Sequence, residues 1–185
     1  MPILIIIGLA IVAIIGLQVF KTRAPELTTV ANGQTAQPAA ELTVGSQVQD
    51  LEFTRSEGGG KLKLSELKSK VIMVNFWATW CEACMVEMPS IVKLRDLYHD
   101  RGFEVAAINL DENPDVVLAK TMRELKMDFP VYLDPESKIA DLFDVHAIPF
   151  TIILDSQRKV LMIETGERDW NGEDIHSQLE KWLSG

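Results

Sequence analysis

Two cysteines separated by two residues carry the clearest chemical signal in the sequence. Cys81-Glu82-Ala83-Cys84 stands directly after an apolar run, at the start of a segment with helical periodicity. At a helix N-terminus the unpaired N–H groups and the helix dipole favour a thiolate, so Cys81 is expected to attack disulfides. Cys84, about one turn further on, can attack the resulting mixed disulfide and release the product. The spacing therefore predicts thiol-disulfide exchange, with a redox-active disulfide between Cys81 and Cys84.

Zinc binding and simple burial are the competing uses of this cysteine pair. A zinc site needs four ligands, and the three histidines that could complete it are not spaced as a pair (His99, His146 and His176). Two buried structural cysteines fit poorly with a strand-to-helix junction flanked by Trp80. We therefore expect no metal and no cofactor, and we expect Trp80 to border the groove that receives the substrate.

The elements that must position the pair are a buried strand and a helix. Residues 71–77 form a near-continuous apolar run, which is typical of a strand covered on both faces. Helical periodicity follows over about residues 81–99, and a second buried strand is expected over 103–110.

The rest of the chain reads as alternating strands and helices. Glycines 58–60 predict a hairpin, and Pro114 in a first turn predicts a helix start. The remaining expected elements are a strand at 131–133, a helix at 137–143, a hairpin of strands at 151–154 and 160–163, and a C-terminal helix with Ile175, Leu179, Trp182 and Leu183 on its inner face. This order predicts an α/β fold, a central sheet with helices on both faces.

The N-terminal segment reads as a membrane element. Ile3 to Phe20 is an uncharged run of 18 residues, about 27 Å long as a helix and sufficient to cross a hydrocarbon core. No Lys or Arg precedes the run and no small-x-small site follows it, so a retained anchor is favoured over a cleaved signal peptide. The predicted organisation is an anchor at 1–23, a flexible linker at 24–45 and one globular domain at 46–185.

Composition excludes other classes of protein. The 185 residues include 18 Lys+Arg and 27 Asp+Glu, a net charge of -9 that argues against a nucleic-acid partner. Apolar residues make up 47%, which excludes wholesale disorder. Two cysteines are too few for a disulfide framework.

The segment from Val74 to Cys84, VNFWATWCEAC, resembles the active-site segment of the membrane-tethered thioredoxin-like proteins of the TlpA, ResA and CcmG group. The resemblance covers about residues 46–184. Pro89 matches a proline of the active-site helix, and Ile148-Pro149 matches the cis-proline loop that faces the dithiol. It implies a thioredoxin fold with an N-terminal β-hairpin and a central helix-strand insertion at about 112–134, preceded by one transmembrane helix.

The same resemblance implies a biochemical function and a cellular location. It implies reduction of disulfides in protein substrates on the extracytoplasmic side of the cell membrane, often of apocytochrome c in cytochrome c maturation. It also implies a membrane thiol donor of the CcdA or DsbD kind. Glu82 and Ala83 offer no basic group to stabilise a thiolate, so the potential is expected nearer to about -270 mV than to about -120 mV.

Several positions depart from the family pattern. Ala83 replaces a proline, Phe150 replaces a common threonine, and Asn75 stands where thioredoxins carry a buried aspartate. Since an amide cannot exchange protons, another acid must do so. Glu87, three residues after Cys84, matches a glutamate of ResA-like proteins and is expected to lie near the dithiol and to accept the Cys84 proton.

The sequence leaves two alternative functions to consider. A peroxiredoxin-like peroxidase would need the pattern Pro-x3-Thr-x2-Cys, which fails because position 75 is Asn and Thr79 lies two residues before Cys81. A copper-delivering or redox-inert binding module is the other alternative. A copper-binding assay with and without the dithiol would separate that class from exchange chemistry.

Overall fold

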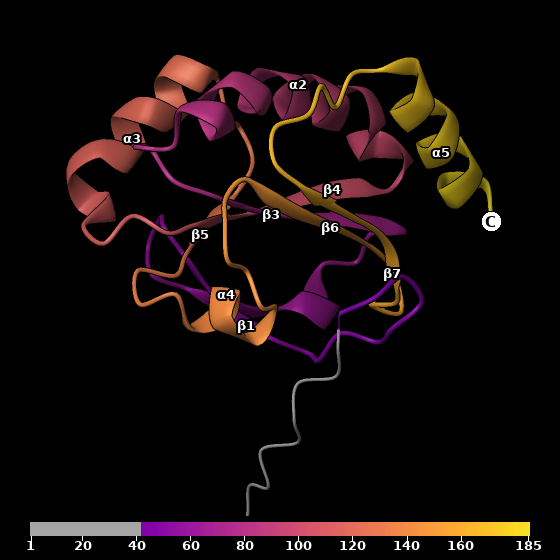
Figure 1. Ribbon diagram of the computed structural model, residues 1–185, viewed down its shortest axis with the longest axis horizontal. Coiled ribbons are helices and arrows are strands. Elements are labelled where there is room, and N and C mark those ends of the chain that lie inside the picture. Colours follow the sequence, from indigo (N-terminus) through magenta and orange to yellow (C-terminus); the bar gives the residue numbers. More distant parts are fainter. Residues whose placement is uncertain (1–41) are drawn as a thin grey trace, which may run out of the picture. The chain divides into compact units, whose positions relative to one another are not determined.

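The computed structural model of the chain describes residues 42–185, which form a sheet sandwiched between helices (Figure 1). The predicted anchor, and the predicted linker up to residue 41, lie outside the described residues. Within 42–185, no helix has both the length and the apolar character needed to cross a membrane.

Seven strands make one mixed sheet in the order β2-β1-β5-β4-β3-β6-β7. β3 pairs in parallel with β4, and β4 with β5, while the outer pairings are antiparallel. The strands are β1 (Glu52–Arg55), β2 (Lys61–Lys63), β3 (Val71–Trp77), β4 (Phe103–Asn109), β5 (Val131–Leu133), β6 (Phe150–Asp155) and β7 (Val160–Thr165). β3 is therefore central, which explains its apolar sequence.

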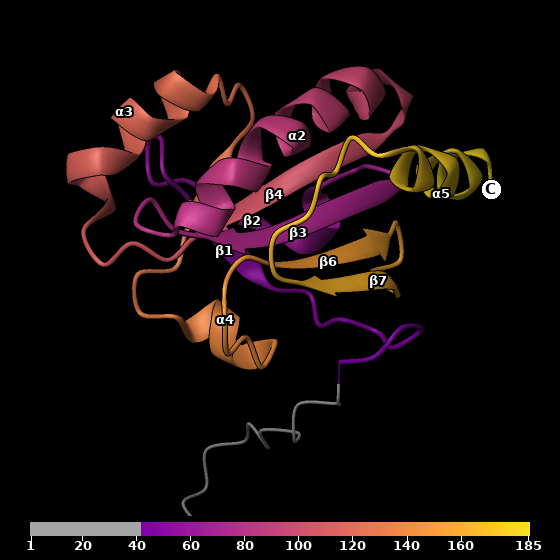
Figure 2. The same ribbon diagram turned by 45° about the horizontal axis from the view of Figure 1, so that its top comes forward.

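Three long helices cover one face of the sheet and a short one covers the other (Figure 1). The covering helices are α2 (Glu82–Tyr98), α3 (Pro114–Leu125) and α5 (Glu173–Ser184), and α4 (Lys138–Leu142) lies opposite with the 3-10 turn Leu64–Glu66. A second 3-10 turn, His99–Arg101, follows α2 directly. Figure 2 shows α2 crossing above β3 and β4.

The two faces of β3 contribute to two separate cores because side chains alternate along a strand. Met73 and Trp77 pack under α2, whereas Ile72, Val74 and Phe76 pack toward α4. Asn75 shares the face of Met73 and Trp77 by the same alternation. A buried amide is thus placed directly beneath the active-site helix.

The predicted thioredoxin fold, with its hairpin and its helix-strand insertion, is confirmed for the described residues. The hairpin is β1 and β2, and the insertion is α3 and β5, whose strand pairs with both β4 and β1. Pro89 lies inside α2 as expected. Three of the four residues predicted for the inner face of the last helix are buried, and Trp182 is partly buried against the same core.

Candidate active site

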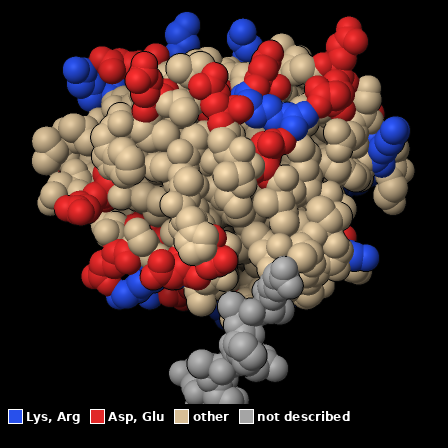
Figure 3. Space-filling view, viewed as in Figure 1, with Lys and Arg blue, Asp and Glu red and all other residues tan. Residues whose placement is uncertain are grey.

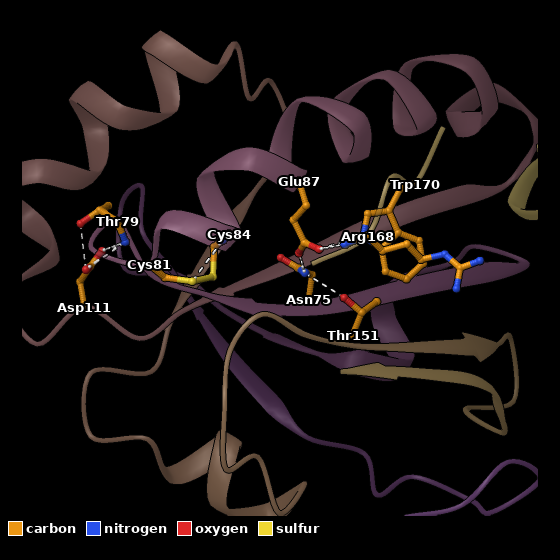
Figure 4. Close-up of a disulfide and its surroundings, with 9 residues drawn as sticks. All are labelled: Asn75, Thr79, Cys81, Cys84, Glu87, Asp111, Thr151, Arg168 and Trp170. Carbon is orange, nitrogen blue, oxygen red and sulfur yellow. Dashed lines mark hydrogen bonds between the residues drawn. A yellow bond between two sulfur atoms is a disulfide. The ribbon is translucent and has the colours of Figure 1, made fainter. Parts of the chain in front are cut away.

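The cysteine pair lies at the beginning of α2, just beyond the end of β3. Cys81 is the N-cap residue, and its Sγ accepts the backbone N–H of Cys84 at 3.2 Å. The two residues are joined in a disulfide (Figure 4). Cys81 is 7% exposed and Cys84 is fully buried. A partner can therefore reach Cys81 first, as expected of an attacking thiol followed by a resolving one.

The loop before β6 packs beside the dithiol. The Ile148–Pro149 peptide bond is cis, as the resemblance implies. Ile148 packs against the core cluster that contains both cysteines. Trp80, on the other side, is 69% exposed and stands immediately before Cys81. The structure thus brings Trp80, Ile148 and Pro149 to the region where sequence reasoning expected them.

A cleft of about 820 Å³ opens next to these residues. Thr79, Trp80 and Ile148 line its dithiol end, and α3 and α4 contribute the far walls. Its lining includes acidic side chains and one histidine but no Lys or Arg. His146 lies in this lining with its side chain 83% exposed and paired with Asp144 at 3.1 Å, which agrees with a surface-loop histidine. On the face in Figure 3, acidic and basic groups surround a middle with few charges.

Glu87 is buried behind the dithiol, on the next turn of α2. It is 2% exposed, and its carboxylate points away from the sulfurs toward β3 and the loop before α5 (Figure 4). Three donors hold it: Asn75 Nδ2 at 2.9 Å on Oε1, and Trp170 Nε1 at 3.2 Å and the Arg168 backbone N–H at 3.3 Å on Oε2. Burial raises the pKa of Glu87 above its ordinary value of 4.5, although these hydrogen bonds counteract the shift.

The amide of Asn75 links Glu87 to the sheet. Its Nδ2 donates both to Glu87 and to Thr151 Oγ1, each at 2.9 Å, and the side chain is fully buried. Its Oδ1 has no hydrogen-bond partner in the described part of the chain. The position that carries an acid in thioredoxins therefore supplies a donor to an acid on the helix.

Sequence reasoning missed Trp170 and Asp111. Trp170 is fully buried and its backbone N–H donates to Ser90 Oγ at 2.9 Å, which fixes the loop before α5 against α2. Nothing in the local sequence predicts the contact between Trp170 and Glu87, which lie 83 positions apart. Asp111 did have a signal, because an acid that closely follows a buried strand lies at the same sheet edge as the end of β3.

Comparison with known proteins agrees with this geometry. Residues 43–181 match the Redoxin family. The thiol-disulfide oxidoreductase ResA of Geobacillus kaustophilus is 32% identical over 172 residues, covering 93% of this chain and 90% of the relative. ResA of Geobacillus thermodenitrificans is 31% identical over 175 residues, covering 95% and 91%.

A solved structure shares the fold as well. The Chlorobium tepidum protein described as a thiol:disulfide interchange protein DsbE superposes with a TM-score of 0.69 at 28% identity, covering 77% of this chain and 99% of the other. The cysteine pair at the start of α2 therefore lies in a fold that the Chlorobium tepidum protein shares. The chain therefore belongs to the Redoxin family and, within it, to the thioredoxin-like thiol-disulfide oxidoreductases of the ResA, TlpA and CcmG type.

Proposed function

We propose that this protein reduces disulfides in protein substrates. The observation that carries the proposal is the asymmetry of the dithiol. Cys81 keeps 7% of its surface exposed, next to Trp80 of the cleft, while Cys84 and an acid with a raised pKa are buried behind it. A strong oxidant would need a stabilised thiolate. The neighbours here are instead acidic, Glu82 in the first turn of α2 and Glu87 one turn later.

The exchange proceeds in two displacements. The Cys81 thiolate attacks one sulfur of the substrate disulfide, that S–S bond breaks, and the first substrate thiolate leaves. Cys84 then gives up its proton, attacks Cys81 Sγ and releases the second substrate thiolate. The product is the Cys81–Cys84 disulfide that the structure contains. Glu87 is the proposed acceptor of the Cys84 proton because burial gives it a raised pKa. Since its carboxylate points away from the sulfurs, the proton would pass through intervening water.

The cleft suits an extended polypeptide with basic and apolar side chains. Trp80 and Ile148 give apolar contacts at the dithiol end, and Glu112 and Asp141 supply acidic groups in a lining without Lys or Arg. Charge complementarity of this kind favours a cationic partner and speeds its encounter. Apocytochrome c is the substrate that the family resemblance suggests.

The proposed site of action is the extracytoplasmic side of the cell membrane. This part of the proposal rests on the uncharged run from Ile3 to Phe20 and on the family resemblance. A membrane thiol donor of the CcdA or DsbD kind would return the disulfide to the dithiol by the same two displacements in the opposite direction.

Trapping of mixed disulfides tests the assignment. Cys84→Ser retains the attacking sulfur and lacks the resolving one, so it should accumulate mixed disulfides with substrate proteins, and Cys81→Ser should accumulate few. Equal trapping by both variants would contradict the division of roles. For the direction, the reduction potential of the purified protein should lie nearer to about -270 mV than to about -120 mV, and a value near the oxidising end would refute a reductant.

A further inference from the structure

A second buried carboxylate lies on the other side of the dithiol from Glu87. Figure 4 shows Asp111 and Thr79 beside Cys81, whereas Glu87 lies beyond Cys84. Asp111 is 4% exposed and follows β4. It accepts the Thr79 backbone N–H at 3.2 and 3.3 Å on its two oxygens, the Thr79 hydroxyl at 2.9 Å and Asn109 Nδ2 at 2.8 Å. Asp111 therefore anchors the loop in which Trp80 directly precedes Cys81.

Hydrogen bonds from Thr79 and Asn109 hold the Asp111 side chain in place. Both oxygens of the carboxylate accept such bonds. Among the described residues, no Lys, Arg or His forms an ion pair with it. The carboxylate is therefore held by hydrogen bonds from Thr79 and Asn109 rather than by a counter-ion.

We propose that Asp111 is a positioning residue for the exchange reaction: it fixes the Thr79–Trp80 loop, and its negative charge disfavours the thiolate form of Cys81. This inference rests on the proposed reductase function and concerns the same site. An anion beside the attacking sulfur disfavours the thiolate. It therefore opposes the helix N-terminus, whose N–H groups favour the thiolate at Cys81.

The size of the effect follows from distance. Asp111 binds the backbone two residues before Cys81, so its charge lies on the order of 10 Å from Sγ, since each residue spans at most about 3.6 Å. At an effective dielectric constant of about 20, one charge at that distance shifts a pKa by on the order of one unit. The other ionisable groups around Cys81 are Glu82 and Glu87 of α2, and Glu112, Asp141 and His146 of the cleft. Those other than Glu87 are exposed, so water screens them more strongly.

The test is the pH dependence of Cys81 alkylation in the reduced protein. Asp111→Asn removes the charge and should lower the Cys81 thiol pKa by on the order of one unit. The thiolate fraction at neutral pH then rises about tenfold, and because a less basic thiolate is a weaker nucleophile, the alkylation rate should rise about threefold. Asp111→Ser, also neutral but smaller, is measured beside it so that the test does not depend on one side chain fitting the site.

Two control variants separate charge from packing. Asp115→Asn removes an exposed acidic charge in the first turn of α3 and should leave the thiol pKa unchanged. Thr79→Val removes one hydrogen bond but keeps the Asp111 charge, and it should not lower the thiol pKa. The proposal is overturned if neither neutral variant of Asp111 lowers the pKa, or if Thr79→Val lowers it equally.

The role of Asp111 and the proposed reductase function can fail independently in this test. An oxidising potential of the unaltered protein would refute the reductase, yet the difference between it and Asp111→Asn would still measure the effect of the charge. Conversely, a reducing potential together with unchanged alkylation in both neutral variants would leave the reductase standing and refute the role of Asp111.

Discussion

Replacing Trp170 by Phe tests whether Glu87 is held as an anion by its neighbours. The change removes one N–H that donates to Glu87 Oε2 at 3.2 Å and retains an aromatic ring in the same fully buried position. The Arg168 guanidinium, 5.7 Å above the ring, keeps a face to pack on. The hydrogen bond is therefore the main interaction lost.

The expected magnitude follows from the kind of bond. A hydrogen bond to a charged group contributes about 1.5–3 kcal/mol, and at 3.2 Å the lower end applies. Two donors, Asn75 and the Arg168 backbone, remain on the carboxylate. Loss of about 1.5 kcal/mol from the ionised form corresponds to about one pKa unit between the variant and the unaltered protein, so the pKa of Glu87, which burial already raises, should rise further.

The assay is urea unfolding of Trp170→Phe across a range of pH, together with the pH profile of disulfide reduction. The variant should lose more stability at high pH, where Glu87 is ionised, than at low pH, where it is protonated. The limb of the rate profile that reports Glu87 should move to higher pH. Trp182→Phe on α5 is the matched control, since that side chain is only partly buried. An equal loss of stability at every pH, with an unmoved rate profile, would refute the reasoning.

Two further predictions concern Glu87 and the N-terminus. Because burial raises the pKa of Glu87 above 4.5, the folded state binds its proton more tightly than the unfolded chain does, so stability falls as pH rises through the interval between the two values. Glu87→Gln should remove this slope from urea unfolding curves and lower the thiol pKa values of the cysteines; parallel stability curves and unchanged thiol titration would contradict it. The full chain should stay in the membrane fraction through high-salt and carbonate washing, and a soluble form lacking residues 1–23 would count against the anchor.

Local sequence patterns predicted the strands and helices well, because a strand buried on both faces leaves a near-continuous apolar run in the sequence. The apolar run at 71–77 matches β3 residue for residue, and α2 begins one residue after Cys81. The start of α4 shows where local patterns fail. Ser137 was the expected first residue, yet it adopts a positive φ of 54° and makes no side-chain cap. Asp134 binds the N–H groups of Ile139 and Ala140 instead, each at 2.9 Å.

The site was predictable where its residues are close in sequence and unpredictable where they are not. Cys81, Cys84 and Glu87 lie within seven residues of one another, at the N-cap and in the first turns of α2. Spacing placed the two cysteines, whereas Glu87 was placed by the family resemblance and by the amide at Asn75. The partners of Glu87 come from β3 and from the loop before α5, which only the folded chain brings together. Sequence reasoning recognised Asn75 as a lost acid. It did not reveal that the same amide donates to the acid on α2.

The Asn75 amide, whose Oδ1 has no hydrogen-bond partner among the residues that the structure describes, gives the pair of Asn75 and Glu87 a property that two carboxylates would lack. In the present orientation the amide donates to Glu87 and to the Thr151 hydroxyl, which suits an ionised carboxylate. Rotating the amide by half a turn would direct Oδ1 at both groups, so that a protonated Glu87 and the Thr151 hydroxyl could donate to it. An aspartate at position 75 could only accept. Asn75 of β3 can therefore form a hydrogen bond with Glu87 of α2 in either ionisation state of the acid. A proton can bind to Glu87 and leave it without a second charge being buried beside it.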